Sequence, residues 1–173
     1  LGTIARRLGA CAVHLLDGAD GAVSTIDASL AGHPVTLYGD AKLGSSDSKF
    51  GSSSLRLDGS GDYLSMPDSD DWDFGTKPFT IDFWAKLTAD QTGMFFYQTG
   101  SGTGFSLQYF PNGEIDLDIS SGGKRMITQT FSSGLNLDRW HHIALVRSGT
   151  TSEGWALFID GLSQTMTQFS SFG

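Results

Sequence analysis

A strict alternation of apolar and polar residues over Phe79–Leu87 limits the fold of this chain more than any other feature. The odd positions of the segment are all apolar, and most of the even positions are polar. This period of two is the pattern of a β-strand with one buried face and one solvated face. Trp84 is the exception, because it places a large ring on the polar side. The segment predicts a half-buried strand that carries one aromatic side chain on its polar face.

The residues before this strand predict two further extended segments. Leu55 and Leu57 alternate with polar residues, Gly59–Gly61 has the composition of a tight turn, and Tyr63–Met66 resumes the extended pattern. We therefore expect a strand, a tight turn and a second strand.

Most of the remaining chain also reads as short strands between Gly, Ser, Asn and Thr turns. Ala12–Leu16 and Val35–Tyr38 come first, and the later segments are GMFFYQT, GFSLQYF, GEIDLDI, RMITQTF, WHHIALVR, GWALFID and LSQTMTQ. Helix is limited to one turn around Asp70–Phe74. Such a succession is typical of an antiparallel sandwich. We predict an all-β fold, a two-sheet antiparallel β-sandwich, whose core includes Leu57, Phe79, Ile81, Phe83, Leu107, Ile115, Leu117, Leu145 and Phe158.

Composition narrows the classes of function. A chain of 173 residues can bury about two-thirds of its unfolded surface, so it needs no disulfide to form a core. Its single cysteine, Cys11, is expected to be a small buried apolar residue. The net charge of −8 and the scattered basic residues speak against nucleic-acid binding. No apolar run approaches the roughly 20 residues of a membrane span.

Four phrases in a fixed order resemble a known family. They are FGSSSLRLDGSGDYLSMPDS, FTIDFW, WHHIALVRSG and LFIDG, and their joint order is more specific than any one phrase. The chain resembles laminin-G-like domains with the concanavalin A-like jelly-roll fold over roughly Ala12–Asp160. With VHLLDGADG near the start, the wording is most similar to copies in bacteriophage virion proteins.

The resemblance implies a domain at 11–173 after an arm or linker at 1–10, and it does not fix a ligand. It implies a non-catalytic binding or adhesion module, in a virion or on an extracellular surface, with a glycan or other subunits as partner. A purely structural capsid-decoration or tail protein is the alternative.

Three carboxylates, Glu114, Asp116 and Asp118, alternate with apolar residues and so share one face of a strand. Laminarinase-type glycosidases, which have a similar sandwich, carry a Glu-Ile-Asp-x-Glu strand. Glycosidases that retain the anomeric configuration need two carboxyl groups about 5 to 5.5 Å apart. The Cα atoms of residues i and i+4 on a strand are about 13 Å apart. Asp118 is one methylene too short for the acid role. We predict no catalytic residue here, and keep glycoside hydrolysis as a weaker alternative.

Aspartates gather in one Gly-rich stretch and suggest a possible calcium site. They are Asp58, Asp62, Asp68, Asp70, Asp71 and Asp73. Calcium takes six to eight oxygen ligands and tolerates irregular loops, but the spacing does not fit an EF-hand. The alternative is that Asp58 and Asp62 make turn hydrogen bonds and that the others are solvated.

Aromatic residues are the other candidates for ligand contact, because aromatic rings can stack on sugars. They are Trp84, Tyr97, Phe110 and Trp155. Glu114 and Asp116 are also candidates for ligand contact, as carboxylates that line a ligand groove. His33 is expected on a surface loop. His141 and His142 point to opposite faces of one strand, so they cannot chelate one ion together, and one of them is expected in the core.

The C-terminal segment lacks the Ile-Asp-Glu-like phrase that closes the sandwich in the resembled family. The chain ends in SQTMTQFSSFG after the LFIDG hairpin. An open sheet edge favours pairing with another chain, so we expect a homo-oligomer or a larger assembly.

Overall fold

The computed structural model describes residues 14–75, 77–98, 103–111, 113–121, 124–132, 134–149 and 154–171. These residues form strands and one 3-10 turn, which confirms the all-β class. The arm at 1–10, Cys11 and the start of the strand expected at Ala12 lie outside the described residues. The chain divides into two compact units, unit 1 with Leu1–Phe74 and Thr80–Ala85, and unit 2 with Gly75–Phe79 and Lys86–Gly173.

Unit 2 contains a five-stranded antiparallel sheet. Its strands are β8 (Gly93–Gln98), β9 (Thr103–Tyr109), β10 (Glu114–Ser121), β11 (Lys124–Ser132) and β15 (Met166–Ser171), in the order β15-β11-β10-β9-β8. β15 forms from the segment that lacks the expected closing phrase. Backbone pairing with β11 needs no particular side chains, so the missing phrase did not prevent this strand.

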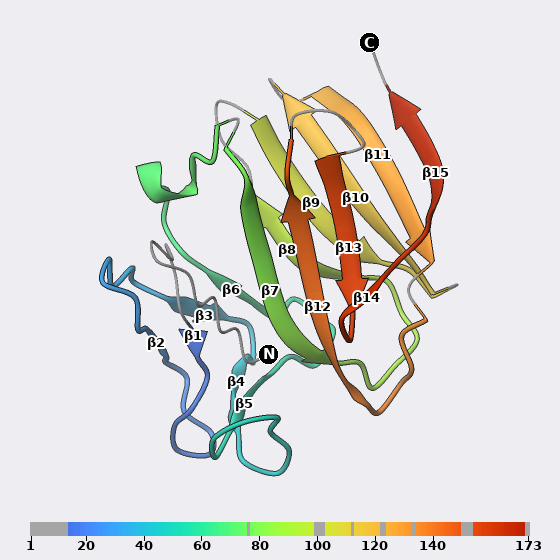
Figure 1. Cartoon of the computed structure of the whole chain (residues 1–173). Coiled ribbons are helices and arrows are strands. Elements are labelled where there is room, and N and C mark those ends of the chain that lie inside the picture. The colour runs from blue at the N-terminus through green and yellow to red at the C-terminus, as the bar shows by residue number, and fades with distance from the viewer. Residues whose placement is uncertain are drawn as a thin grey trace. The chain divides into compact units, whose positions relative to one another are not determined.

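A second sheet has four strands. They are β7 (Phe79–Lys86), β12 (Trp140–Arg147), β13 (Trp155–Ile159) and β14 (Leu162–Ser163), in the order β14-β13-β12-β7. In Figure 1, β12 and β13 lie in front of the layer formed by β9 and β10. The ring centroids of Phe105 in β9 and Trp155 in β13 are 6.0 Å apart, so side chains of the two layers meet. The predicted sandwich is confirmed.

The core of unit 2 consists of the alternating residues that the sequence predicted. Leu107, Ile115, Leu117 and Leu145 are fully buried, and Phe79 is almost so. Phe83, which belongs to unit 1, is also buried, whereas Ile81 and Phe158 are only half-buried. Leu57 was wrongly placed in the core, because its strand ends at Arg56 and the side chain is 42% exposed.

Unit 1 is built from three two-stranded ribbons instead of long strands. β1 (His14–Leu15) pairs with β2 (Ile26–Asp27), β3 (Thr36–Tyr38) with β6 (Tyr63–Ser65), and β4 (Lys42–Gly44) with β5 (Ser54–Arg56). The 3-10 turn η1 (Asp70–Trp72) follows, close to the single turn predicted at 70–74. The strand, tight turn and strand predicted around Leu55 and Tyr63 are present as β5 and β6, and each of these strands pairs with an earlier segment of the chain.

A small apolar cluster holds these ribbons together. It consists of Leu16, Ala41, Leu43 and Leu55, with Ala22, Leu37 and Leu64 packed against it. Around it, carboxylates accept backbone amides from distant turns. Asp17 accepts the Ser52 amide and hydroxyl, and Asp20 accepts those of Ser45. These hydrogen bonds lower the pKa of both carboxyl groups.

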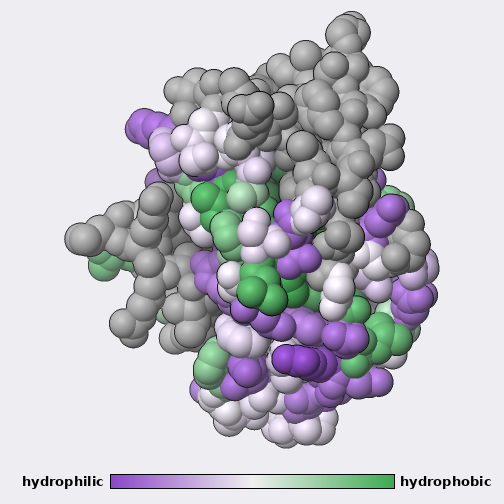
Figure 2. Space-filling view, turned by 45° about the vertical axis from the view of Figure 1, so that its right-hand side comes forward, coloured by the Kyte–Doolittle hydropathy of each residue, from purple (hydrophilic) through white to green (hydrophobic). Residues whose placement is uncertain are grey.

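Exposed apolar side chains are spread over the described residues. The largest exposures are those of Val23, Ile26, Leu30, Tyr97 and Leu162. In the coloured part of Figure 2, apolar atoms lie in separate groups between polar atoms. Among the described residues, no helix has the length and hydropathy to span a membrane.

Candidate functional site

The backbone register of the five-stranded sheet aligns residues of neighbouring strands in rows. The register aligns one row, Tyr97–Ser106–Asp118–Thr128–Ser170, and a neighbouring row, Met94–Gln108–Asp116–Thr130–Gln168. Directly paired residues of antiparallel strands lie on the same face. At about 4.8 Å per strand, each row is roughly 19 Å long. We call these two rows the sheet-face site.

The buried residues on the same strands show which face this is. Phe105, Leu107, Ile115 and Leu117 alternate with the residues of the site and are at most 5% exposed. Phe105 also contacts Trp155 of the opposite sheet. The alternation therefore places Ser106, Asp116 and Asp118 on the side of the sheet that faces away from the sandwich core.

Tyr97 is the aromatic group of the sheet-face site. It lies on β8, pairs with Ser106, and is 66% exposed. Met94, at the equivalent end of the neighbouring row, is 50% exposed. A bulge between Met94 and Phe96 shifts the register of β8 between these two residues. Ser106, the residue paired with Tyr97, is only 8% exposed, and Asp118 is half-buried. The exposed Tyr97 ring is therefore the group that can stack on a flat apolar surface of a ligand.

The structure places Glu114, Asp116 and Asp118 as the sequence predicted, on one face of β10. All three residues are half-buried, and one carboxylate oxygen of Asp116 is buried. Phe110 is half-buried and follows β9 opposite Glu114, whose carbonyl accepts the Phe110 amide at 2.9 Å. Four predicted residues, Tyr97, Glu114, Asp116 and Phe110, therefore come from three neighbouring strand segments of this sheet.

The two predicted tryptophans are not on this face. Trp155 is 9% exposed and packs against Phe79 and Phe105, with Arg147 5.7 Å from its ring centroid. It is a core residue, so its prediction as a ligand contact is wrong. Its place at the start of β13, between the sheets, explains why: the ring continues the inward row of Leu157 and Ile159. Trp84 lies in unit 1, half-buried, with the Lys49 ammonium over its ring.

Two of the aspartates predicted to bind calcium, Asp58 and Asp62, accept backbone amides. Asp62 accepts the amides of Asp40 and Asp58, and Asp58 accepts the amide of Ser60. These are the turn hydrogen bonds of the alternative reading. Among the described residues, no group of three or more His, Cys, Asp or Glu side chains is arranged to hold a metal ion. The residues of this stretch do not form a metal centre in this arrangement.

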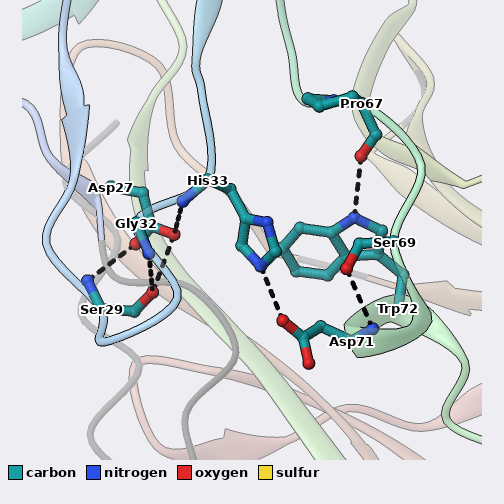
Figure 3. A network of polar contacts seen from close by, with 8 residues as sticks. All are labelled: Asp27, Ser29, Gly32, His33, Pro67, Ser69, Asp71 and Trp72. Carbon is teal, nitrogen blue, oxygen red and sulfur yellow. Dashed lines mark hydrogen bonds and ion pairs between the residues drawn. The ribbon is translucent and has the colours of Figure 1, made fainter.

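His33 is not the simple surface histidine expected from the sequence. Its ring lies 4.6 Å from that of Trp72, and Nε2 is 2.9 Å from Asp71 Oδ2 (Figure 3). The contact lacks the alignment of a ring N–H hydrogen bond, so it acts as an ion pair only when His33 is protonated. The His33 amide donates to Asp27 Oδ2, and the Trp72 indole donates to the Pro67 carbonyl. The network joins the loop after β2 to η1. These segments lie far apart in the sequence, so no local pattern predicts their contact.

His141 is the buried histidine that the sequence predicted. Nε2 accepts the Asn136 amide at 3.1 Å, which leaves Nδ1 to donate to Asp160 Oδ2 at 2.8 Å. Both ring nitrogens of His141 therefore have partners inside the protein. Burial raises the pKa of Asp160, but hydrogen bonds from His142 and His141 outweigh it and lower the pKa overall. The pair links β12 to the turn that follows β13.

Sequence reasoning missed two groups of exposed aromatic residues. Tyr38 and Tyr63 stack at 4.5 Å across β3 and β6 and are 43% and 51% exposed. Phe50, 53% exposed, meets the edge of Trp84 at 5.7 Å. The stacked tyrosines depend on a pairing that the sequence did not reveal, and Phe50 lies in a loop without periodicity.

One comparison with known proteins gives a match. A family model described as the concanavalin A-like lectin/glucanases superfamily matches residues 58–171, well over half of the chain. The search of curated proteins and the search of solved structures found no match. The match says nothing of a bacteriophage origin, so that part of the resemblance stays a prediction.

Proposed function

The chain belongs to the concanavalin A-like lectin/glucanases superfamily, and we propose that it is a non-catalytic module that binds a glycan on the sheet-face site. The observation that carries the proposal is the row in which exposed Tyr97 is aligned with Ser106 and Asp118. Sugars offer apolar C–H faces and many hydroxyl groups. A ring with adjacent hydrogen-bond acceptors suits both features.

The charge of the site favours a neutral glycan. The ten register positions of the two rows contain two aspartates and no lysine or arginine. Phosphate- or sulfate-rich ligands need clustered basic groups, which these positions lack. A carboxylate such as Asp118 can instead accept hydrogen bonds from a pair of sugar hydroxyls.

The absence of catalysis is part of the proposal. Glu114 and Asp118 are four positions apart on one strand, and Asp118 carries the shorter side chain. We expect the protein to release no reducing sugar from laminarin or mixed-linkage glucan. Turnover that disappears in Glu114→Gln would instead make Glu114 the nucleophile and support the glycosidase alternative.

A glycan array tests the binding. We expect wild-type protein to bind neutral glycans equally with and without a calcium chelator. Tyr97→Ala should weaken binding about tenfold, since stacking contributes roughly 1 to 1.5 kcal/mol. Tyr63→Ala is the matched control, because it removes an exposed tyrosine outside the sheet face. Equal binding by wild type and Tyr97→Ala would refute the site.

The setting of the protein in a virion or on an extracellular surface stays a prediction, as does self-association. In the alternative, purely structural role, the sheet-face site would contact another subunit. Sedimentation of wild type and Tyr97→Ala separates the two roles. An oligomer that dissociates in the variant, with no glycan binding by wild type, would favour the structural role.

A further inference from the structure

Lys49, Phe50 and Trp84 form a second constellation that the sheet-face site does not use. The Lys49 ammonium lies 4.1 Å from the Trp84 ring centroid and 5.8 Å from that of Phe50. The Phe50 ring meets Trp84 edge-on, at an interplanar angle of 86°. These residues belong to one unit, although 34 positions separate Phe50 from Trp84. Two rings at right angles and one cation form a corner, which we call the Lys49 corner.

The cation of this corner has no acidic partner. Among the residues that the structure describes, no carboxylate lies within ion-pair distance of Lys49. In contrast, Arg56 in β5 contacts Ser46 and lies near Asp20. Lys49 and Phe50 are both exposed. In a chain with 19 acidic and 11 basic residues, a solvent-exposed ammonium without a carboxylate neighbour leaves its charge available to a ligand.

The two rings define what such a ligand looks like. The Trp84 ring is half-buried, and the Lys49 ammonium lies over it. Once the ammonium moves away, the part of the Trp84 ring that it covered and the perpendicular Phe50 ring would form an apolar wall and a side wall. Such walls suit a six-membered ring with apolar C–H faces. The Lys49 ammonium can leave the ring at small cost, since an exposed cation–π contact contributes about 0.5 to 1 kcal/mol. It can then pair with an anionic group carried by that ring.

We propose that the Lys49 corner binds a pyranose that carries a single carboxylate, such as a terminal uronic acid. The charge of the protein limits the number of negative charges that the ligand can carry. With one cation at the corner and a net charge of −8 on the chain, a polyanion would meet repulsion that one lysine does not offset. A neutral sugar would form no ion pair with Lys49. It would also have to displace the ammonium from the Trp84 ring without offering the ammonium a new partner. The site is separate in its residues from the sheet-face site and does not depend on it.

A pair of probes that differ only at one carbon tests the proposal. Methyl β-glucuronide carries a carboxylate where methyl β-glucoside carries a hydroxymethyl group. We expect titration with the glucuronide to shift the Trp84 indole N–H resonance and the Lys49 side-chain signals, and the glucoside to give at least about tenfold weaker binding. The Trp72 indole, which donates to the Pro67 carbonyl, is an internal reference that should not shift. Acetate, which has the charge without the ring, should bind more weakly than the glucuronide.

Variants assign the effect to the corner. Lys49→Gln should weaken glucuronide binding about tenfold, because it removes the charge and keeps most of the side chain. Lys42→Gln is the matched control, since Lys42 is an exposed lysine of the same unit and lies near Asp20. Phe50→Ala should weaken binding of the glucuronide more than that of acetate. Tyr97→Ala should leave glucuronide binding unchanged, which separates this site from the sheet-face site.

Three results would overturn the proposal. They are glucuronide affinity that Lys49→Gln leaves intact, equal affinity for glucuronide and glucoside, and no shift of the Trp84 indole at any glucuronide concentration tested. Tight binding of polygalacturonate in place of the single uronate would also contradict it, because that outcome requires more cations than the corner holds.

Discussion

The two units of the molecule are held together in different ways. Unit 2 has strands of five to nine residues, apart from the two-residue β14, and their pairing is interrupted by a few register shifts. Six of the seven largest fully buried side chains lie there, and only Leu43 lies in unit 1. Burial of apolar area contributes about 25 cal/mol per Å², so unit 2 has the larger apolar contribution to stability.

Unit 1 relies instead on hydrogen bonds between side chains and backbone. Apart from the part of β7 that belongs to unit 1, its paired strands are two or three residues long. Asp17, Asp20, Asp27 and Asp62 each accept at least one backbone amide. A net contribution of about 0.5 to 1.5 kcal/mol per bond makes each link weak. The sheet-face site therefore lies on the unit with the larger apolar core. In the Lys49 corner, Lys49 and Phe50 lie in a loop and Trp84 lies in β7.

The largest predicted effect comes from opening the core of unit 2. Leu117→Ala should lower the free energy of unfolding by about 2 to 5 kcal/mol, because it removes a fully buried side chain and leaves a cavity. Leu57→Ala is the control and should stay within about 0.5 kcal/mol of wild type, since Leu57 is exposed. Chemical denaturation measures both. Equal losses in the two variants would contradict the assignment of Leu57 to the surface.

The second effect depends on pH. The pKa of Asp160 is lowered in the folded state, so its carboxylate stabilises the fold above the ordinary pKa of about 4, and this contribution is lost as pH falls through the lowered pKa. Asp160→Asn should cost about 1 kcal/mol at pH 7. Asparagine tolerates the φ of 52° at this position, so the backbone conformation is kept. Denaturation at pH 7 and pH 3 should show the difference shrinking at low pH, and a constant difference would rule out the charge as its cause.

The third effect is local and confined to unit 1. Asp62→Ala removes the acceptor of the Asp40 and Asp58 amides and should cost about 1 kcal/mol. Hydrogen exchange should show faster exchange of these two amides, while those of β10 keep their protection. Loss of protection in β10 to the same extent would mean that the two units open together, against the comparison drawn above.

The difference between the units also explains which parts of the fold sequence reasoning found. Alternation over Phe79–Leu87 and in GEIDLDI located β7 and β10 and their buried sides, because long strands show their period. The two- and three-residue strands of unit 1 have too few residues to show one. β2 and β4 were not predicted, so the pairing of β5 with β4 was not predicted either.

Alternation predicts which residues share a face of a strand, whereas tertiary packing determines which aromatic residues are exposed. The face shared by Glu114, Asp116 and Asp118 follows from spacing alone. Whether a tryptophan is core or surface does not, since Trp155 continues a buried row and Trp84 lies beneath Lys49. The contact of His33 with Asp71 likewise joins segments 38 residues apart, which no local pattern reveals.

The smallest predicted effect concerns calcium, and it tests whether unit 1 is ordered by its own hydrogen bonds. A site occupied at a hundredfold excess over Kd would stabilise the fold by about 2.7 kcal/mol, which raises Tm by roughly 5 to 10 °C in a chain of this size. Because Asp58 and Asp62 already accept backbone amides, we expect calcium at millimolar concentration to move Tm by less than about 1 °C. Magnesium at the same concentration controls for ionic strength. A calcium-specific rise of several degrees that disappears in Asp62→Ala would mean that the aspartates reorganise around an ion, and unit 1 would then be a metal-ordered region instead of a self-sufficient one.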